Sequence, residues 1–164
     1  MDSSWNQYGV VQVLTHMTEC DQRIGYVIFD CVCLLLGAAE CRTALTEEAA
    51  EAVVKASEPV LSKMEQYIVT LASEEASTTE KAAAVFNVGS TIWSGGCLGG
   101  VVSAWLGTLT VGDQVLYSAT ALATLLAMFA TDGAAEIGVV AVELATAGWL
   151  VSDSVKCAEA CDYS

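Results

Sequence analysis

Hydrophobic positions in the second half of the chain form long runs that no charged side chain interrupts. Residues 82–112 extend for 31 positions without a charge, and eighteen further uncharged residues follow Asp113. A helix needs about 20 apolar residues to cross a bilayer, so these runs are long enough to span or enter a membrane. Together with turn signals at Gly112–Asp113 and Asp132–Gly133, they predict three apolar helices, near 82–111, 114–131 and 134–152.

The first half of the chain shows a different, amphipathic pattern. From Thr46 to Leu71, apolar residues recur every three or four positions, which predicts a helix of roughly thirty residues. Thr46 is its expected N-cap, and Pro59 should kink or interrupt it. Ile24–Ala39 is apolar apart from Asp30 and predicts a buried helix. Ser77 and Glu80 match a capping box, so another helix should begin there.

These patterns together predict the fold class. The alternation of polar and apolar residues that is typical of strands is nearly absent. We therefore predict an all-α protein, a helical bundle with two regions. Residues 1–76 form an acidic amphipathic helical region, and residues 77–164 form a strongly apolar region of about three helices with a short C-terminal tail.

Charge narrows the range of partners. The 164 residues carry six Lys and Arg and a net charge of −14. Phosphate binding requires clustered cations, so nucleic acid is an unsuitable partner. The same scarcity of cations argues against docking on anionic lipid through a basic patch. Apolar burial would have to drive any contact with a bilayer. The expected partners are therefore a lipid bilayer and other membrane helices, in an oligomer or larger complex.

Small residues recur at every fourth position in the first apolar run. They are Gly95, Gly99, Ser103 and Gly107. Small residues at this spacing allow helix backbones to approach closely, in lipid or in a tightly packed bundle. We predict that this ladder is a helix-packing surface.

Two carboxylates of the third apolar run are the candidate binding residues. Glu136 and Glu143 lie seven positions apart, with Asp132 four positions before Glu136. Ionisable groups at membrane depth usually face a protein interior, a water path or a partner. One hypothesis makes Glu136 and Glu143 ion-binding or pH-sensing groups. The alternative places Asp132 and Glu136 in a turn and Glu143 on the wet side of a helix.

Seven cysteines indicate disulfides in an oxidising compartment. Because the number is odd, at least one thiol stays free, and Cys97 inside the apolar run is the expected one. Long-range pairs are expected, such as Cys20–Cys41 or a bond from Cys157 or Cys161 to the N-terminal flank. The alternative is that these residues are free, buried thiols. The six disulfide candidates are Cys20, Cys31, Cys33, Cys41, Cys157 and Cys161.

Catalytic and metal-binding patterns are weak throughout. His16 is the sole histidine, and nothing near it in the sequence suggests an activated nucleophile. The cysteine spacings do not supply the four loop ligands of a zinc site, and SGGCLGG lacks the lysine of a phosphate loop. We therefore predict a protein that is not an enzyme and binds no metal. The residues identify no cofactor.

Two functions remain from the sequence. The first is a non-enzymatic, membrane-embedded helical protein that serves as an accessory or structural subunit of a membrane complex. The mean hydropathy of +0.53 favours it. The alternative is a secreted, soluble pore-forming protein that inserts an apolar helical hairpin into a target membrane. Colicin-like and killer-toxin-like proteins work this way, an analogy of design only. The acidic charge, the cysteines and the Ala/Gly/Thr-rich helices favour the alternative.

Overall fold

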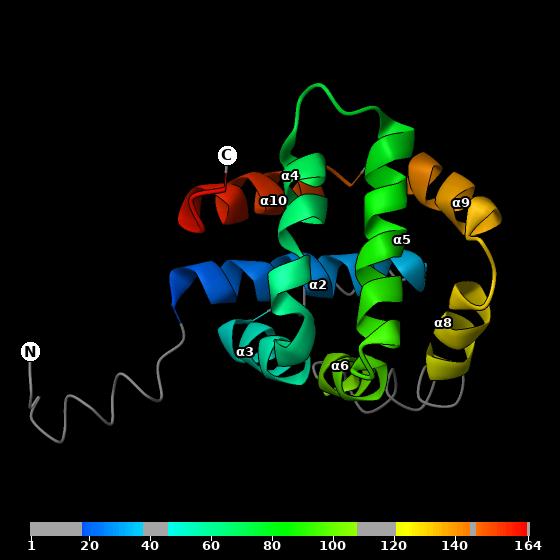
Figure 1. The fold of residues 1–164 in the computed structure, drawn as a ribbon, viewed down its shortest axis with the longest axis horizontal. Coiled ribbons are helices and arrows are strands. Elements are labelled where there is room, and N and C mark those ends of the chain that lie inside the picture. Colours follow the sequence, from blue (N-terminus) through cyan, green and yellow to red (C-terminus); the bar gives the residue numbers. More distant parts are fainter. Residues whose placement is uncertain (1–17, 38–45, 108–120, 145–146, 164) are drawn as a thin grey trace, which may run out of the picture.

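The computed structural model describes residues 18–37, 46–107, 121–144 and 147–163. Within these ranges the chain is helical, without a strand, and the helices pack on one another as an all-α bundle (Figure 1). The predicted fold class is confirmed. The elements are α2 (Glu19–Leu35), α3 (Glu47–Ala56), the 3-10 helix η3 (Glu58–Lys63), α4 (Glu65–Ala72), α5 (Thr78–Ser94), α6 (Leu98–Leu106), α8 (Ala121–Phe129), α9 (Ala134–Leu144) and α10 (Gly148–Ala160).

Helix α2 is the centre of the bundle. It contacts α3, α5 and α10, while the antiparallel helices α4 and α5 cross it in Figure 1. Thr18 caps its start, since the Thr18 hydroxyl accepts a hydrogen bond from the Asp21 N–H at 3.1 Å. Gly25 allows the crossing with α3, because a Cβ there would lie 2.5 Å from the Ala50 carbonyl oxygen. Buried residues line α2 from Ile24 to Leu35, as the apolar run predicted.

The amphipathic segment is interrupted where its proline predicted. The Thr46 hydroxyl accepts from the Ala49 N–H at 3.1 Å and caps α3, as expected. Helix α3 ends at Ala56, and Pro59 stands in the first turn of η3, where its missing N–H costs no helical hydrogen bond. The buried Ser57 hydroxyl donates to the Val53 carbonyl at 2.7 Å, which satisfies its polar atom in the interior.

The longest uncharged run is two helices, so the single helix predicted for 82–111 is wrong. Helix α5 begins with the predicted capping box of Ser77 and Glu80. It ends in a Schellman motif, in which the Cys97 N–H donates to the Ile92 carbonyl and Gly96 takes a φ of +78°. After this turn the chain continues as α6, bent by 113° from α5.

The remaining apolar segments also differ from the prediction within the described residues. The helix expected for 114–131 is described only from Ala121, as α8, which ends at Phe129. The single helix expected over 134–152 is wrong, because α9 ends at Leu144 and α10 begins at Gly148. The apolar region therefore folds as a series of short helices.

The small-residue ladder does not form one packing face, because the turn after α5 divides it. Gly95 lies against the Val60 side chain, which leaves no space for a Cβ. Gly99 and Ser103 are exposed on α6, with open space beside Gly99. Gly107 forms the C-cap of α6 and lies near only that helix's own carbonyls. Among the described residues, Gly95 is the member of the ladder that packs closely on another element, and the role of the ladder as a helix-packing surface stays a prediction.

Candidate functional site

Helices α8 and α9, bent by 117° from one another, form an open pair at one side of the bundle, packed on α5 (Figure 1), and this pair is called the hairpin below. Local hydrogen bonds hold the turn between them. The Thr131 hydroxyl donates to the Met128 carbonyl at 2.7 Å, and the Asp132 carboxylate accepts from the Ala134 N–H at 3.0 Å. Gly133 has a φ of +79° and passes so close to the Phe86 ring that a Cβ would lie 2.6 Å from it. The turn is therefore fixed by local hydrogen bonds and by the close contact of Gly133 with the Phe86 ring.

An aromatic cluster fastens the hairpin to α5. The Phe129 ring lies edge-on to Phe86, with ring centroids 5.4 Å apart, and stacks against Trp93 at 6.2 Å. Phe129 is buried, together with Ala121 and Leu125 on the same side of α8. This inner face of α8 is ordinary core packing.

The outer face of the hairpin is apolar although it is exposed. Leu122 and Leu126 on α8 are each 39% exposed, and Val139 and Val142 on α9 are 61% and 75% exposed. Thirteen of the residues from 121 to 144 are exposed, and Asp132 is the only charged one among them. A helix on the surface of a water-soluble protein usually carries polar residues on its outer face. The hairpin lacks such a face.

A pocket of about 320 Å³ opens between the hairpin and the end of α2. Aliphatic side chains dominate its lining, and Glu136 is the one charged residue among the described residues that line it. These residues are Leu34, Leu35, Leu36, Gly37, Thr124, Met128, Ala135, Glu136, Val139 and Val140. The lining of the pocket is therefore mainly apolar, like the outer face of the hairpin.

The candidate carboxylates occupy different environments on α9. Glu136 stands in the first turn, where the helix dipole favours a negative charge, and it lines the pocket. Glu143 is half-buried in the last turn of α9, and burial raises the pKa of its carboxyl. Asp132 acts in the turn, as the structural alternative expected. Neither the ion-binding nor the pH-sensing hypothesis for Glu136 and Glu143 is tested by this geometry.

In the described part of the chain, no single helix has both the length and the hydropathy to cross a bilayer. Two bent pairs reach the required length and composition when their members are counted together. They are α5 with α6, bent by 113°, and α8 with α9, bent by 117°. The two pairs differ in burial. Helix α5 carries seven buried residues, including Val85, Phe86 and Ile92, whereas α9 carries only Val140 and Leu144.

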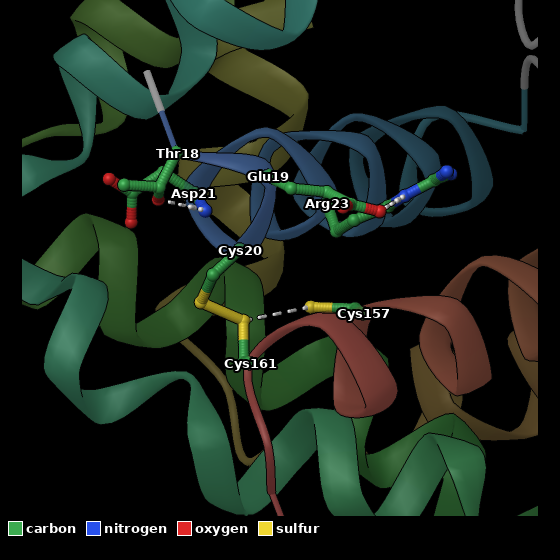
Figure 2. Close-up of a disulfide and its surroundings, with 7 residues drawn as sticks. All are labelled: Thr18, Glu19, Cys20, Asp21, Arg23, Cys157 and Cys161. Atoms are coloured by element: carbon green, nitrogen blue, oxygen red, sulfur yellow. Dashed lines mark hydrogen bonds and ion pairs between the residues drawn. A yellow bond between two sulfur atoms is a disulfide. The ribbon is translucent and has the colours of Figure 1, made fainter. Parts of the chain in front are cut away.

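One disulfide links the two ends of the described bundle. Cys20 at the start of α2 bonds to Cys161 after α10, at a sequence separation of 141 and with Cα atoms 4.6 Å apart (Figure 2). A bond from the C-terminal cysteines to the N-terminal flank was expected and is confirmed. The example pairing Cys20–Cys41 is wrong.

The remaining cysteines divide into bonded and free. Cys33 is disulfide-bonded, and its Sγ accepts a hydrogen bond from the Trp105 indole N–H at 3.3 Å. Cys31, Cys97 and Cys157 are free and buried. The free Cys97 was expected, whereas Cys31 and Cys157 are not the disulfide partners that the sequence suggested. Cys41 and His16 lie outside the described residues.

A metal centre has no support in the part of the chain that the structure describes, where no group of three or more His, Cys, Asp or Glu could hold an ion. Asp30 is completely buried in α2, and it raises the pKa of the buried neighbouring Cys31 thiol, after the larger effect of burial itself. A thiol held protonated in this way is a poor nucleophile.

Sequence reasoning missed two features of this site. The first is the contact of the Cys157 thiol with the Cys20–Cys161 disulfide, for which the Cys157–Cys161 spacing was the available signal. The second is the exposure of α8 and α9. The sequence does not reveal it, because these helices are as apolar in composition as a buried helix. No protein-family model, curated protein or solved structure matches this chain.

Proposed function

We propose that this protein acts on lipid bilayers without catalysis, by inserting the α8–α9 hairpin while the rest of the chain remains a disulfide-linked bundle. Among the sequence-derived hypotheses, this one is the secreted, pore-forming type. The observation that carries it is the outer face of the hairpin, where Leu122, Leu126, Val139 and Val142 are exposed on helices that have almost no charge.

The energetic reason is the transfer of this face out of water. Burying apolar surface contributes roughly 25 cal/mol per Å². Lipid would cover the face without needing a basic patch, which the chain lacks. Phe129 lies on the same side of α8 as Leu122 and Leu126, and these two leucines stand at the edge between the buried and the exposed sides of the helix. The hairpin can therefore present Leu122 and Leu126 to lipid at that edge while Phe129 keeps its contacts with α5.

Helix length limits how deep the hairpin can reach. At about 1.5 Å per residue, the 9 residues of α8 extend roughly 14 Å and the 11 residues of α9 roughly 17 Å. The hydrocarbon core is about 30 Å thick, so each helix reaches about halfway across. The proposed insertion is re-entrant, within one leaflet, and several copies would have to gather to open a path for solutes.

A second candidate is the membrane-embedded accessory subunit. Its specific support is that α5 with α6, and α8 with α9, have the combined length and composition of broken spans. The burial of α5 against α2, α4 and α9 weighs against it, because a lipid-facing span would present those residues to the bilayer.

Dye-loaded phosphatidylcholine vesicles provide the test. The full chain, purified without detergent, should float with the vesicles and release the dye. Leu126→Glu and Val142→Glu should each reduce binding at least tenfold, because a carboxylate would enter hydrocarbon. Val155→Glu on α10, where the side chain is 37% exposed, is the matched control and should bind like the parent chain.

The alternatives give different results in the same experiment. A chain that sediments with cell membranes and resists alkaline extraction would favour the accessory subunit. A chain that remains in solution and neither binds the vesicles nor releases the dye would contradict both membrane functions. Equal losses in Val155→Glu and Leu126→Glu would show that the hairpin is not the contact surface.

A further inference from the structure

Three sulfur atoms lie together where the end of α10 meets the start of α2. Figure 2 shows them in the order Cys20, Cys161, Cys157, with the first two bonded. The Cys157 sulfur lies 3.9 Å from the Cys161 sulfur. Because Cys161 carries no proton in the disulfide, the Cys157 thiol is the donor of this contact. A free thiol therefore points at the sulfur of an existing disulfide.

Regular structure fixes this arrangement on both sides. Cys157 and Cys161 are four residues apart, so they lie on one face of α10 and its C-cap. A Schellman motif ends α10, with the Tyr163 N–H donating to the Ala158 carbonyl at 2.9 Å and Asp162 at a φ of 57°. Cys20 is held by the Thr18 cap at the start of α2. The sulfurs are thus positioned by two capped helix ends.

Burial decides which reaction is open to Cys157. Its side chain has no exposed surface, whereas Cys20 and Cys161 are partly exposed. Dissolved oxidants and thiols therefore reach the disulfide more easily than they reach Cys157. The electrophile in contact with the Cys157 sulfur is the sulfur of Cys161, at 3.9 Å.

We infer that Cys157 is the internal exchange partner of the Cys20–Cys161 disulfide. The Cys157 thiol gives its proton to a solvent base that enters beside the partly exposed disulfide, and the resulting thiolate attacks the Cys161 sulfur. A Cys157–Cys161 bond forms as the Cys20–Cys161 bond breaks, and its electron pair leaves on the Cys20 sulfur, which takes up a proton. One disulfide and one thiol exist before and after, so the step requires no oxidant or reductant.

The product bond has an accessible geometry. Four residues of an α-helix rise about 6 Å, within the range of roughly 4.4–6.8 Å that separates Cα atoms across a disulfide. Two Cβ atoms on the same face of a helix are less well aligned than in the long-range pair. We therefore expect the Cys20–Cys161 form to predominate, with the exchanged form as a minor species that releases the start of α2 from α10.

Burial of the Cys157 thiol makes the exchange slow at neutral pH. Burial raises the pKa of the Cys157 thiol to about 12, Arg23 on α2 opposes this rise, and Asp153 on α10 adds to it. Tyr163 also faces Cys157, and its own pKa is raised by burial, Cys157, Glu65 on α4 and Asp21 on α2. Only the thiolate attacks. At pH values below the pKa of Cys157, the rate should therefore rise about tenfold for each unit by which the pH increases.

The test traps the released thiol. The folded full chain is incubated anaerobically with iodoacetamide and a chelator between about pH 7 and pH 10, and disulfides and alkylated cysteines are then mapped by mass spectrometry. We expect alkylated Cys20 in molecules that carry a Cys157–Cys161 bond, with a yield that rises with pH. Circular dichroism at each pH checks that the helices persist.

Two cysteine variants serve as controls. Cys157→Ser, or Cys157→Ala if the serine variant does not fold, should slow the alkylation of Cys20 at least tenfold. In Cys20→Ser, mild oxidation with diamide should join Cys157 to Cys161.

Three results would overturn the inference. The first is alkylation of Cys157 alone, with the Cys20–Cys161 bond intact. The second is unchanged alkylation of Cys20 in the Cys157 variants, which would assign the attack to another thiol. The third is failure of Cys157 and Cys161 to pair in folded Cys20→Ser.

Discussion

The ring of Phe129 lies directly against the backbone of Gly89, so that a Cβ on Gly89 would be 2.5 Å from the Phe129 Cζ atom. This contact brings α8 onto α5. We predict that Gly89→Ala pushes the ring away and lowers the free energy of unfolding by about 1–3 kcal/mol, the usual effect of overpacking. Urea unfolding followed by circular dichroism measures the change.

Gly99 provides the matched control for that substitution. It lies in α6, and a Cβ there would meet nothing within 4 Å. Gly99→Ala should leave stability unchanged or raise it by up to about 1 kcal/mol, through helix propensity. If Gly89→Ala is as stable as Gly99→Ala, the packing of Phe129 on Gly89 is not what attaches the hairpin.

Loss of the long-range disulfide should destabilise the chain strongly. The Cys20–Cys161 bond joins residues at a sequence separation of 141, and a bond of this kind typically contributes about 2–5 kcal/mol. Cys20→Ser should therefore lower the urea midpoint by a corresponding amount under non-reducing conditions. Cys97→Ser, at a buried free thiol, is the comparison and should cost less. Equal midpoints for Cys20→Ser and the parent chain would contradict the stabilising role of the bond.

The capping box at the start of α5 should give a pH-dependent contribution to stability. Hydrogen bonds from the Ser77 backbone N–H and then its side chain lower the pKa of Glu80. A depressed carboxyl pKa stabilises the folded state above the unfolded pKa, and this contribution is lost as pH falls through the folded pKa. Ser77→Ala should cost about 1 kcal/mol at neutral pH.

The pH series separates the cap from ordinary packing. The difference in unfolding free energy between Glu80→Gln and the parent chain should shrink in acid, below the usual range of a glutamate, because the Ser77 backbone N–H that binds the carboxylate is present in both chains. A difference that is constant from neutral pH to strong acid would show that the charge on Glu80 does not contribute.

Glu143 should have the opposite dependence on pH. Burial raises the pKa of its carboxyl, so the folded state binds the proton more tightly than the unfolded state does. The contribution of Glu143 is most favourable below the unfolded pKa and is lost as pH rises through the folded pKa. At neutral pH, Glu143→Gln should raise stability by less than about 1 kcal/mol, because solvent reaches part of the side chain.

The Glu143→Gln variant also bears on the proposed membrane function. Vesicle binding by the parent chain should increase in mild acid, where a protonated Glu143 enters lipid more easily. The variant should show that increased binding already at neutral pH. Glu47→Gln, an exposed residue at the start of α3, is the control and should not change the pH profile. Identical profiles for parent and variant would exclude Glu143 as the responsible group.

The local features of this fold could be predicted from sequence because their causes are local. The caps at Thr46 and Ser77 and the interruption before Pro59 depend on residues within one or two turns. The bend after α5 had a local signal as well, since Gly95 and Gly96 permit a Schellman motif. That signal was outweighed by the length of the uncharged run, which periodicity alone does not divide.

The candidate site depended on information that the sequence pattern does not contain. Helices α5 and α9 are both apolar on most sides, yet α5 is buried and α9 is largely exposed. Which of them lies inside is decided by long-range packing, such as the contact of Phe129 with Gly89. The pairing of Cys20 with Cys161 is likewise a result of where α2 and α10 meet, and spacing alone left several pairings open.

The disulfide between Cys20 and Cys161 turns the described bundle into a covalent ring. A single cleavage of the backbone between these residues opens the ring, but the two fragments remain joined by the disulfide. The stretch between α4 and α5 offers the exposed residues Glu74 and Glu75 to a glutamate-specific protease. The two pieces would migrate as one band until a reductant is added. Because the disulfide keeps α2 and α10 joined, the two fragments of the cleaved protein would refold together as one molecule.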